Sequence, residues 1–219
     1  MSQLSLQLNG SNPTSTKIKD RCELVQVTKE ECKDLLRKYH YLSNISKGFK
    51  TKFNVGLRLD GELVGVCIFT GFPVPQLCEG MLGLKRTEQA GLWELSRLCL
   101  SPSVQGAEKN LTSWFVARAM KMLRKEEYVR VILSYADSNH HSGTIYRACN
   151  FKYYGLTDRK TDFFKREEDG SYNQVQRGPV KHLEGEWRPR SRKHRFLLIY
   201  DRKLNCKWEE QSYPKPKGE

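Results

Sequence analysis

The chain lacks the long apolar runs of a membrane protein. No stretch approaches the ~20 consecutive apolar residues that a membrane helix needs. The first residues, MSQLSLQLNGSNPTSTK, also lack the basic start and apolar core of a signal peptide. We therefore expect a cytoplasmic protein with no membrane partner.

The chain also lacks closely spaced cysteine pairs and has fewer acidic than basic residues. The seven cysteines are odd in number, scattered, and never spaced as Cys-x-x-Cys, which argues against a disulfide scaffold or structural zinc. Lys plus Arg number 38 against 25 acidic residues, a formal net charge of +13. That excess favours a polyanionic partner, most simply nucleic acid, although a generic basic protein stays possible.

Helix and strand patterns alternate along the chain. An apolar run at 23–27 precedes a capping box at Thr28 and Glu31, and Asp60-Gly61 joins two apolar strands as a type I′ hairpin. Further strands are expected at 92–100, 129–133 and 196–200, with a helix from Leu111. The sequence therefore predicts an α/β fold, a mixed central sheet flanked by helices, in one domain with a C-terminal β extension around Asp169-Gly170. The expected limits are 1–20 for a flexible arm, 21–205 for the domain and 206–219 for a loose basic tail.

The segment 134–155, SYADSNHHSGTIYRACNFKYYG, carries the most information. A buried strand leads into a polar cluster that begins at Asp137, and a short helix with Tyr146 follows. Polar groups at the end of a strand are typical of α/β active sites, and a tyrosine hydroxyl is able to protonate a leaving thiolate. Alternatively, Tyr146 and Phe151 are core aromatics.

The strand 92–100 and the loop to Asn110 form a candidate anion site. Loop amides and a helix N-terminus together favour a group such as pyrophosphate, and Gln105, Gly106 and Ala107 permit close backbone approach. Lys109 adds charge, and Asn110 is a candidate cap. An ordinary strand-to-helix turn explains the same residues.

Two further groups are candidates for chemistry. His40 and Tyr41 follow the first long helix, where histidine suits proton transfer but often serves only as a cap. Arg97 lies inside an apolar strand, and a buried arginine needs a partner. We expect that partner to be Asp137, in a pair that is either catalytic or purely structural.

The strand, loop and strand-turn-helix together resemble the GNAT acyltransferase superfamily. Its Tyr-x-x-x-Gly-Phe-like run corresponds here to Tyr146 through Phe151. The resemblance implies an acetyl-CoA or related acyl-CoA donor. Its implied binding residues are Leu98, Leu100, Gln105, Gly106, Ala107, Lys109 and Asn110, although the loop lacks the glycines of the usual pattern.

The motifs His40-Tyr41, Leu95-Ser96-Arg97-Leu98 and Tyr135-Ala136-Asp137 look like the Mom family of phage DNA-modification proteins. That resemblance implies a divergent GNAT fold that converts adenine in DNA to a carbamoylmethyl derivative at its exocyclic amine and so evades restriction. The implied functional residues are His40, Tyr41, Arg97, Asp137 and Tyr146. A metal proposed for the family would find candidate ligands in His40 and Asp137, two donors far apart in sequence.

A basic run at 188–195 fits a partner of double-stranded DNA. Its cations are Arg188, Arg190, Arg192, Lys193 and Arg195, spaced to contact successive phosphates unless they form a solvated face. An adenine in a duplex must be flipped out to react, and Tyr41, Phe72, Tyr153 and Tyr154 are aromatic candidates for stacking on it.

Two other functions stay open. A conventional acetyl-CoA-dependent N-acetyltransferase would act on a protein or small amine and would not need the basic run. A non-catalytic DNA-binding protein would need the run but not Asp137. Oligomeric state, donor and target sequence do not follow from the sequence.

Overall fold

The computed structural model describes residues 17–40, 49–72, 74–175 and 179–215. Its helices and strands, in chain order, are α1 (Ile18–Arg21), β1 (Cys22–Gln26), α2 (Lys29–Tyr39), β2 (Phe53–Leu59), β3 (Glu62–Gly71), α3 (Pro75–Leu82), the 3-10 turn η2 (Arg86–Glu88), β4 (Leu92–Leu100), α4 (Leu111–Glu126), β5 (Val131–Asp137), α5 (Thr144–Ala148), β6 (Lys152–Leu156), β7 (Thr161–Arg166), β8 (Tyr172–Val175), β9 (Gly185–Pro189) and β10 (Lys193–Ile199).

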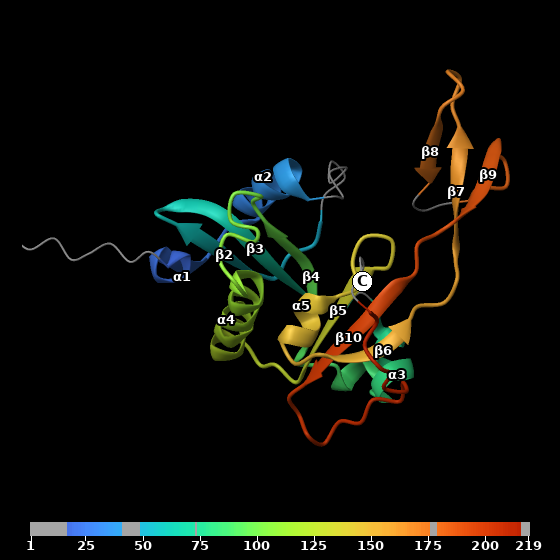
Figure 1. Cartoon of the computed structure of the whole chain (residues 1–219). Helices are drawn as coiled ribbons and strands as arrows, with labels where there is room; N and C mark the ends of the chain where they lie inside the picture. The colour runs from blue at the N-terminus through green and yellow to red at the C-terminus, as the bar shows by residue number, and fades with distance from the viewer. Residues whose placement is uncertain (1–16, 41–48, 73, 176–178, 216–219) are drawn as a thin grey trace, which may run out of the picture.

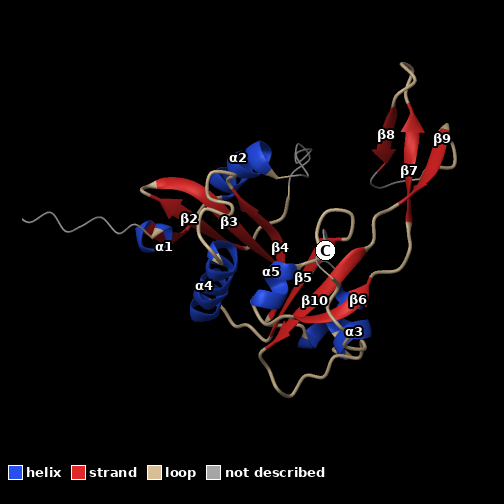
Figure 2. Cartoon of the chain, in the orientation of Figure 1, coloured by secondary structure: helices blue, strands red, loops and turns tan. Residues whose placement is uncertain are grey.

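A seven-stranded mixed sheet forms the centre of the molecule (Figure 1). Its strand order is β1-β2-β3-β4-β5-β10-β6. The β4–β5 pair is parallel and all other neighbours are antiparallel. A second sheet, β8-β7-β9, stands away from the first (Figure 2). The prediction of a mixed α/β fold with a C-terminal β extension is confirmed.

Local sequence signals explain several elements. The Thr28 side chain accepts from the Glu31 amide while the Glu31 carboxylate accepts from the Thr28 amide, so the predicted capping box begins α2. Asp60 and Gly61 have φ values of 49° and 88°, as the turn between β2 and β3 requires. Both predicted features are confirmed.

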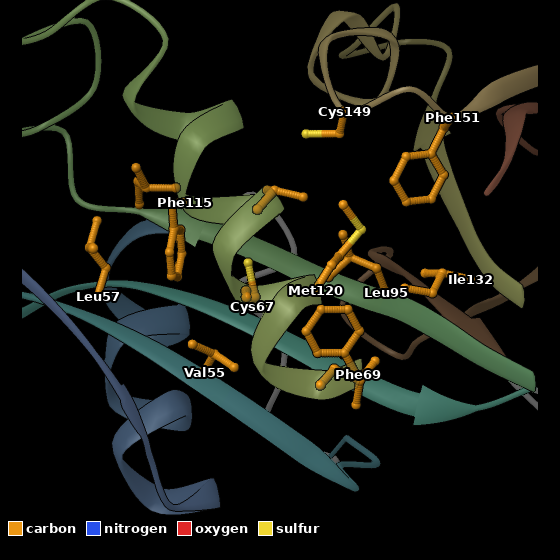
Figure 3. Packing of buried hydrophobic residues seen from close by; sticks show 14 of the residues in the cluster. Val55, Leu57, Cys67, Phe69, Leu95, Phe115, Met120, Ile132, Cys149 and Phe151 are labelled. Atoms are coloured by element: carbon orange, nitrogen blue, oxygen red, sulfur yellow. The ribbon is translucent and has the colours of Figure 1, made fainter. Parts of the chain in front are cut away.

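Helices cover both faces of the sheet. The largest apolar cluster lies between α4 and the sheet and contains Phe69, Leu95, Phe115 and Phe151 (Figure 3). On the other face, α2 buries Cys32, Leu35 and Leu36 against β3 and β4, and α3 buries Met81 further along the sheet. Figure 1 shows α2 and α4 on opposite sides of β2, β3 and β4.

The structure differs from the sequence expectation in two elements. The connection 71–90 contains a helix, α3, which begins with Pro75 and ends at Gly83 in the left-handed region. Proline at the first helical position and glycine after the last one are usual helix signals. In addition, β5 continues to Asp137, four residues beyond the apolar run, because β10 pairs with it as far as Lys193.

Segments near both ends of the described chain contact residues of the central sheet or of the helices and loops around it. Near the N-terminus, Lys19 Nζ lies 3.0 Å from a carboxylate oxygen of Glu108. In the segment expected to be a loose tail, the Lys207 amide donates to Met81 O at 2.7 Å and the Gln211 amide to Tyr153 O at 2.9 Å. Within the part of the chain that the structure describes, no helix is long and apolar enough to cross a membrane.

Candidate functional site

A cleft opens where β4 and β5 separate. Their parallel pairing covers only Leu92–Leu95 and Val131–Ser134, although both strands continue beyond it. At the last paired position, Ser134 Oγ donates to Leu95 O at 2.8 Å. Beyond this point the two strands enclose a cleft of about 800 Å³, and no strand in the described part of the chain pairs with the edge of β4 that faces β5.

A β-bulge at Ser96 determines which side chains face each side of the cleft. Ile68 pairs with Arg97 and Phe69 with Leu95, so Ser96 is the extra residue, and its hydroxyl donates to Ile68 O at 3.1 Å. Leu95 and Leu98 consequently both pack towards α4. Glu94 and Arg97 therefore share the opposite face, which a regular alternation would not allow.

Ionisable side chains line that face of the cleft, which we call the ionisable half. Glu94 and Arg97 come from β4, Tyr135 and Asp137 from β5, and Lys193 from β10 opposite Asp137. His40, at the end of α2, lines the same cleft. The fold thus gathers titratable groups from four elements.

His40 is a buried, neutral histidine. It is the C-cap of α2, its amide donates to Leu36 O at 2.9 Å, and it is only 9% exposed. Burial, followed by the charges of Arg97 and His141, lowers its pKa to about 4. The imidazole is therefore uncharged at neutral pH and suits hydrogen bonding better than it suits a cationic role.

Arg97 and Asp137 line the same cleft but form no ion pair, so the predicted pairing is wrong. Arg97 donates to Ser96 O at 2.6 Å, and its buried Nε has no hydrogen-bond partner among the described residues. Asp137 accepts from Ser191 Oγ at 2.7 Å and from the Asn139 amide at 2.9 Å. The two side chains lie beyond the paired part of β4 and β5, where the strands diverge.

The pKa of Asp137 reflects its own hydrogen bonds. Burial would raise this pKa, but the bonds from Ser191 and Asn139 and the charges of His140 and Lys193 hold it below its usual value. Asp137 is therefore a carboxylate at neutral pH, fixed to the segment that leads from β9 into β10.

Glu94, Lys193 and Tyr39 were missed as cleft residues. Burial raises the pKa of Glu94, while Arg97 and Lys193 partly offset this effect. Burial and the nearby cations Arg190 and Arg97 lower the pKa of Lys193, which was predicted to contact DNA but lines the cleft. Glu94 carries the same signal that identified Arg97, a charge inside an apolar strand. Tyr39 precedes His40 and is 43% exposed at the cleft.

The opposite side of the cleft, which we call the neutral half, lies between β4, α4 and α5. Its side chains are uncharged; they are Leu98, Leu100, Gln105, Thr112, Thr144, Ile145 and Tyr146. The Tyr146 ring packs 4.9 Å from that of Phe196 and 5.5 Å from that of Phe151, centroid to centroid. Tyr146 is thus both a cleft residue and a core aromatic.

The predicted cofactor loop lies partly at the cleft. Gln105 and Gly106 line it; Gln105 donates to Leu100 O at 2.8 Å, and Gly106 has a φ of 74°. Ala107, Lys109 and Asn110 are exposed but are not among the lining residues. Asn110 occupies the N-cap position of α4, as expected, but its side chain makes no capping hydrogen bond.

The basic run of 188–195 does not form one continuous row. Arg188 pairs with Glu186 at 2.5 Å and lies over the rings of Phe164 and Tyr172, while Arg190 lies 3.6 Å from Asp162. The other cations lie elsewhere. Arg192 donates to Thr157 O at 2.6 Å, Lys193 lines the cleft and Arg195 stacks on Trp208.

The remaining candidates that the structure describes are not gathered at the cleft. Tyr41 lies outside the described residues. Tyr153 and Tyr154 are buried in the core, and Phe72 packs against the cluster at α3, so none of these three is placed to stack on a base. Among the described residues, no three His, Cys, Asp or Glu side chains are grouped to hold a metal ion, so we derive no step through one.

The fold and the cleft define a mixed α/β protein with a two-sided binding site at the separation of two parallel strands. The chain belongs to the Mom protein family, whose sequence profile matches residues 21–215. A search of curated proteins finds no significant match.

Several solved acetyltransferase structures are similar to this one. An acetyltransferase of Bacillus subtilis in complex with CoA is 14% identical, with a TM-score of 0.47, and the match covers 82% of this chain and 97% of that chain. A ribosomal-protein alanine N-acetyltransferase from Escherichia coli is 10% identical, with a TM-score of 0.49 and coverage of 82% and 94%. A GNAT family acetyltransferase from Elizabethkingia anophelis with acetyl-CoA bound is 10% identical, with a TM-score of 0.48 and coverage of 82% and 99%. Similarity at this level assigns no activity to this chain.

Proposed function

We propose that this protein is a DNA modification enzyme that transfers a group to the exocyclic amine of adenine. The product is a carbamoylmethyl-type derivative that protects phage DNA from restriction in the host-cell cytoplasm. The observation that carries the proposal is the two-sided cleft, in which a neutral half faces an ionisable half across diverging strands. Two reactants are able to enter such a cleft from opposite sides of the sheet and meet at its centre.

The neutral half suits an acyl-CoA thioester. The unpartnered edge of β4 offers backbone groups to an extended arm, and Gln105, Gly106 and the first amides of α4 offer donors to a pyrophosphate. Glu108, the acidic residue of this loop, is neutralised by Lys19. The thioester would supply the transferred unit and release coenzyme A as a free thiol, while these residues would bind and orient its carrier.

The ionisable half suits a base carrying an amine. Neutral His40 and the guanidinium of Arg97 line this half, and Asp137 keeps its charge at neutral pH. Tyr146 approaches from the neutral half, where its hydroxyl suits protonation of a leaving group. The target adenine must leave the duplex to reach this half, and exposed Tyr39 offers a stacking surface at the cleft.

The net charge of +13 supports the choice of a polyanionic acceptor. Together with membership of the Mom family, it favours DNA over a small amine.

The test is mass spectrometry of nucleosides from DNA of cells that express the protein. We expect part of the deoxyadenosine to be replaced by a heavier derivative. Arg97→Ala should abolish that product, and the exposed control Arg86→Ala should retain it. Unmodified deoxyadenosine in cells with folded wild-type protein would refute the proposal. Turnover of acetyl-CoA with a simple amine would then favour a conventional N-acetyltransferase.

A further inference from the structure

We propose that Glu94 and Arg97 form a pair that recognises the amino edge of the acceptor base. Glu94 would accept a hydrogen bond from the exocyclic amine, and Arg97 would donate one to the adjacent ring nitrogen. This inference rests on the proposed function and adds to it the residues that select the base. Glu94 is a specificity residue here and takes no part in bond making.

The bulge at Ser96 brings the two side chains together. It places Glu94 and Arg97 on the same face of β4, three residues apart, and both line the cleft. They do not neutralise each other, because no ion pair joins them; Arg97 directs one donor to Ser96 O instead. The two groups therefore present an acceptor and donors side by side towards the cleft.

Glu94 has no structural partner that would explain a charge in this strand. The half-buried carboxylate accepts no hydrogen bond and forms no ion pair with any residue that the structure describes. Buried polar groups in proteins are nearly always hydrogen-bonded, and an exception needs a reason. The buried Nε of Arg97 is such an exception among the described residues. The Glu94 oxygens are not fully buried; they face the cleft, where a ligand that donates to them would replace water.

Burial and the surrounding charges shift the pKa of Glu94 in opposite directions. Burial raises its pKa, but Arg97 and Lys193 act in the opposite sense and favour the carboxylate. Tyr135 also faces this group, and burial together with Glu94 raises the pKa of Tyr135 to about 12. The phenol therefore remains neutral and adds no competing negative charge.

An acceptor beside a donor matches one class of base edge. Adenine presents an amine next to a ring nitrogen, and cytosine does the same, whereas hypoxanthine, guanine and thymine present a carbonyl oxygen there. A carboxylate repels that carbonyl oxygen and leaves it unpaired, so the pair selects bases that carry their amine at this position, which are adenine and cytosine. Selection of adenine over cytosine would then depend on the size of the cleft.

The test measures binding of full-length protein to labelled single-stranded oligonucleotides by fluorescence anisotropy. One central adenine in a thymine background is compared with hypoxanthine, and with purine, which lacks the amine. For wild type we expect adenine to bind roughly 5- to 150-fold more tightly, the range that a bidentate base contact provides. Glu94→Gln should reduce the ratio of adenine to hypoxanthine to within about twofold, because the amide is able to donate to a carbonyl as well as accept. The ratio of adenine to purine should persist in this variant, because the amide oxygen still accepts from the amine.

The matched control is Glu62→Gln, which removes an exposed charge at the start of β3 in the same sheet. It should keep the wild-type ratios. The comparison of adenine with purine needs no variant, so equal binding of the two by wild type overturns the inference directly. Preserved discrimination against hypoxanthine in a folded Glu94→Gln protein overturns it as well. In either case nucleoside mass spectrometry decides separately whether the protein modifies adenine.

Discussion

At the scale of single residues, the state of His40 follows from its position. The imidazole closes the last turn of α2, loses most of its contact with water and faces Arg97 and His141. Each of these effects disfavours the imidazolium. A neutral imidazole beside a guanidinium is able to accept a hydrogen bond in the cleft without adding positive charge.

His40 should make the protein less stable in mild acid. Its pKa is about 4 when folded and about 6.5 when unfolded, so the unfolded chain binds the proton first. The penalty is absent above pH 6.5 and grows as the pH falls towards 4. At pH 5 we expect it to reach about 2 kcal/mol of unfolding free energy.

Urea unfolding at pH 7 and pH 5 measures this effect. His40→Gln should lose about that much less stability between the two pH values, whereas His182→Gln, at an exposed position, should behave like wild type. Equal pH dependence of His40→Gln and wild type would contradict the lowered pKa.

The sequence identifies cleft residues better than it identifies their partners. Arg97 and Asp137 both line the cleft, and both carry a local signal: a charge in an apolar strand and a polar strand end. Their separation is not local. It depends on where β4 and β5 stop pairing and on Ser191, which is 54 residues away from Asp137 in the chain. The position of Glu94 on the same face as Arg97 depends likewise on the bulge at Ser96, which the sequence of the strand does not indicate.

At the scale of elements, the turn from β5 into α5 depends on Gly143. This residue has a φ of 79° and lies against Phe196, whose ring a Cβ at this position would overlap. Gly106, with a φ of 74°, has open space instead. The two glycines share a backbone conformation but differ in their surroundings.

Gly143→Ala should therefore destabilise the protein more than Gly106→Ala. The left-handed conformation alone costs a residue with a Cβ about 1–2 kcal/mol, which is the expected effect at Gly106. At Gly143 the overlap with Phe196 adds to it, so we expect a total above about 2 kcal/mol. Chemical unfolding of both variants measures the difference. An equal loss of unfolding free energy would show that the Phe196 ring moves to make room for the added carbon.

Ser134 joins β4 and β5 by a side-chain hydrogen bond at the last position where the two strands pair. It is fully buried, and its hydroxyl donates to Leu95 O. Ser134→Ala leaves that buried carbonyl without this donor, so we expect a loss of about 1–2 kcal/mol. Ser113→Ala, which removes an exposed hydroxyl-to-carbonyl bond in α4, should change stability by less than about 0.5 kcal/mol. A loss at Ser134 no larger than at Ser113 would contradict the importance of this bond.

Elements with strong local signals were predicted well. The capping box of α2 and the turn at Asp60 are confirmed, because each depends on residues within a few positions. The helix α3 was missed, since eight residues between prolines and glycines look like a loop until their apolar face meets Leu92 and Leu133. Tertiary contact, more than propensity, makes this helix.

At the scale of the whole molecule, the positive charge is unevenly distributed. The segment 161–189, which contains the sheet of β7, β8 and β9, has five Lys or Arg and six Asp or Glu, so it carries none of the excess. At the cleft, by contrast, Arg37 and Lys38 are exposed at the end of α2, directly before Tyr39 and His40. Neither forms an ion pair with a described residue.

DNA bound at the cleft should therefore depend on α2 more than on the strand β9. We expect Arg37→Gln with Lys38→Gln to weaken binding of a DNA duplex and to reduce the slope of log affinity against log salt by about 1.8, or about 0.9 per phosphate contact. Arg188→Gln with Arg190→Gln should reduce it by less than about 1, because Glu186 and Asp162 already hold those two cations. Anisotropy titrations from low to moderate salt compare the two pairs, which remove the same charge. The opposite order would place the duplex on the basic run of 188–195, as the sequence alone suggests, and would leave the cleft to the flipped base alone.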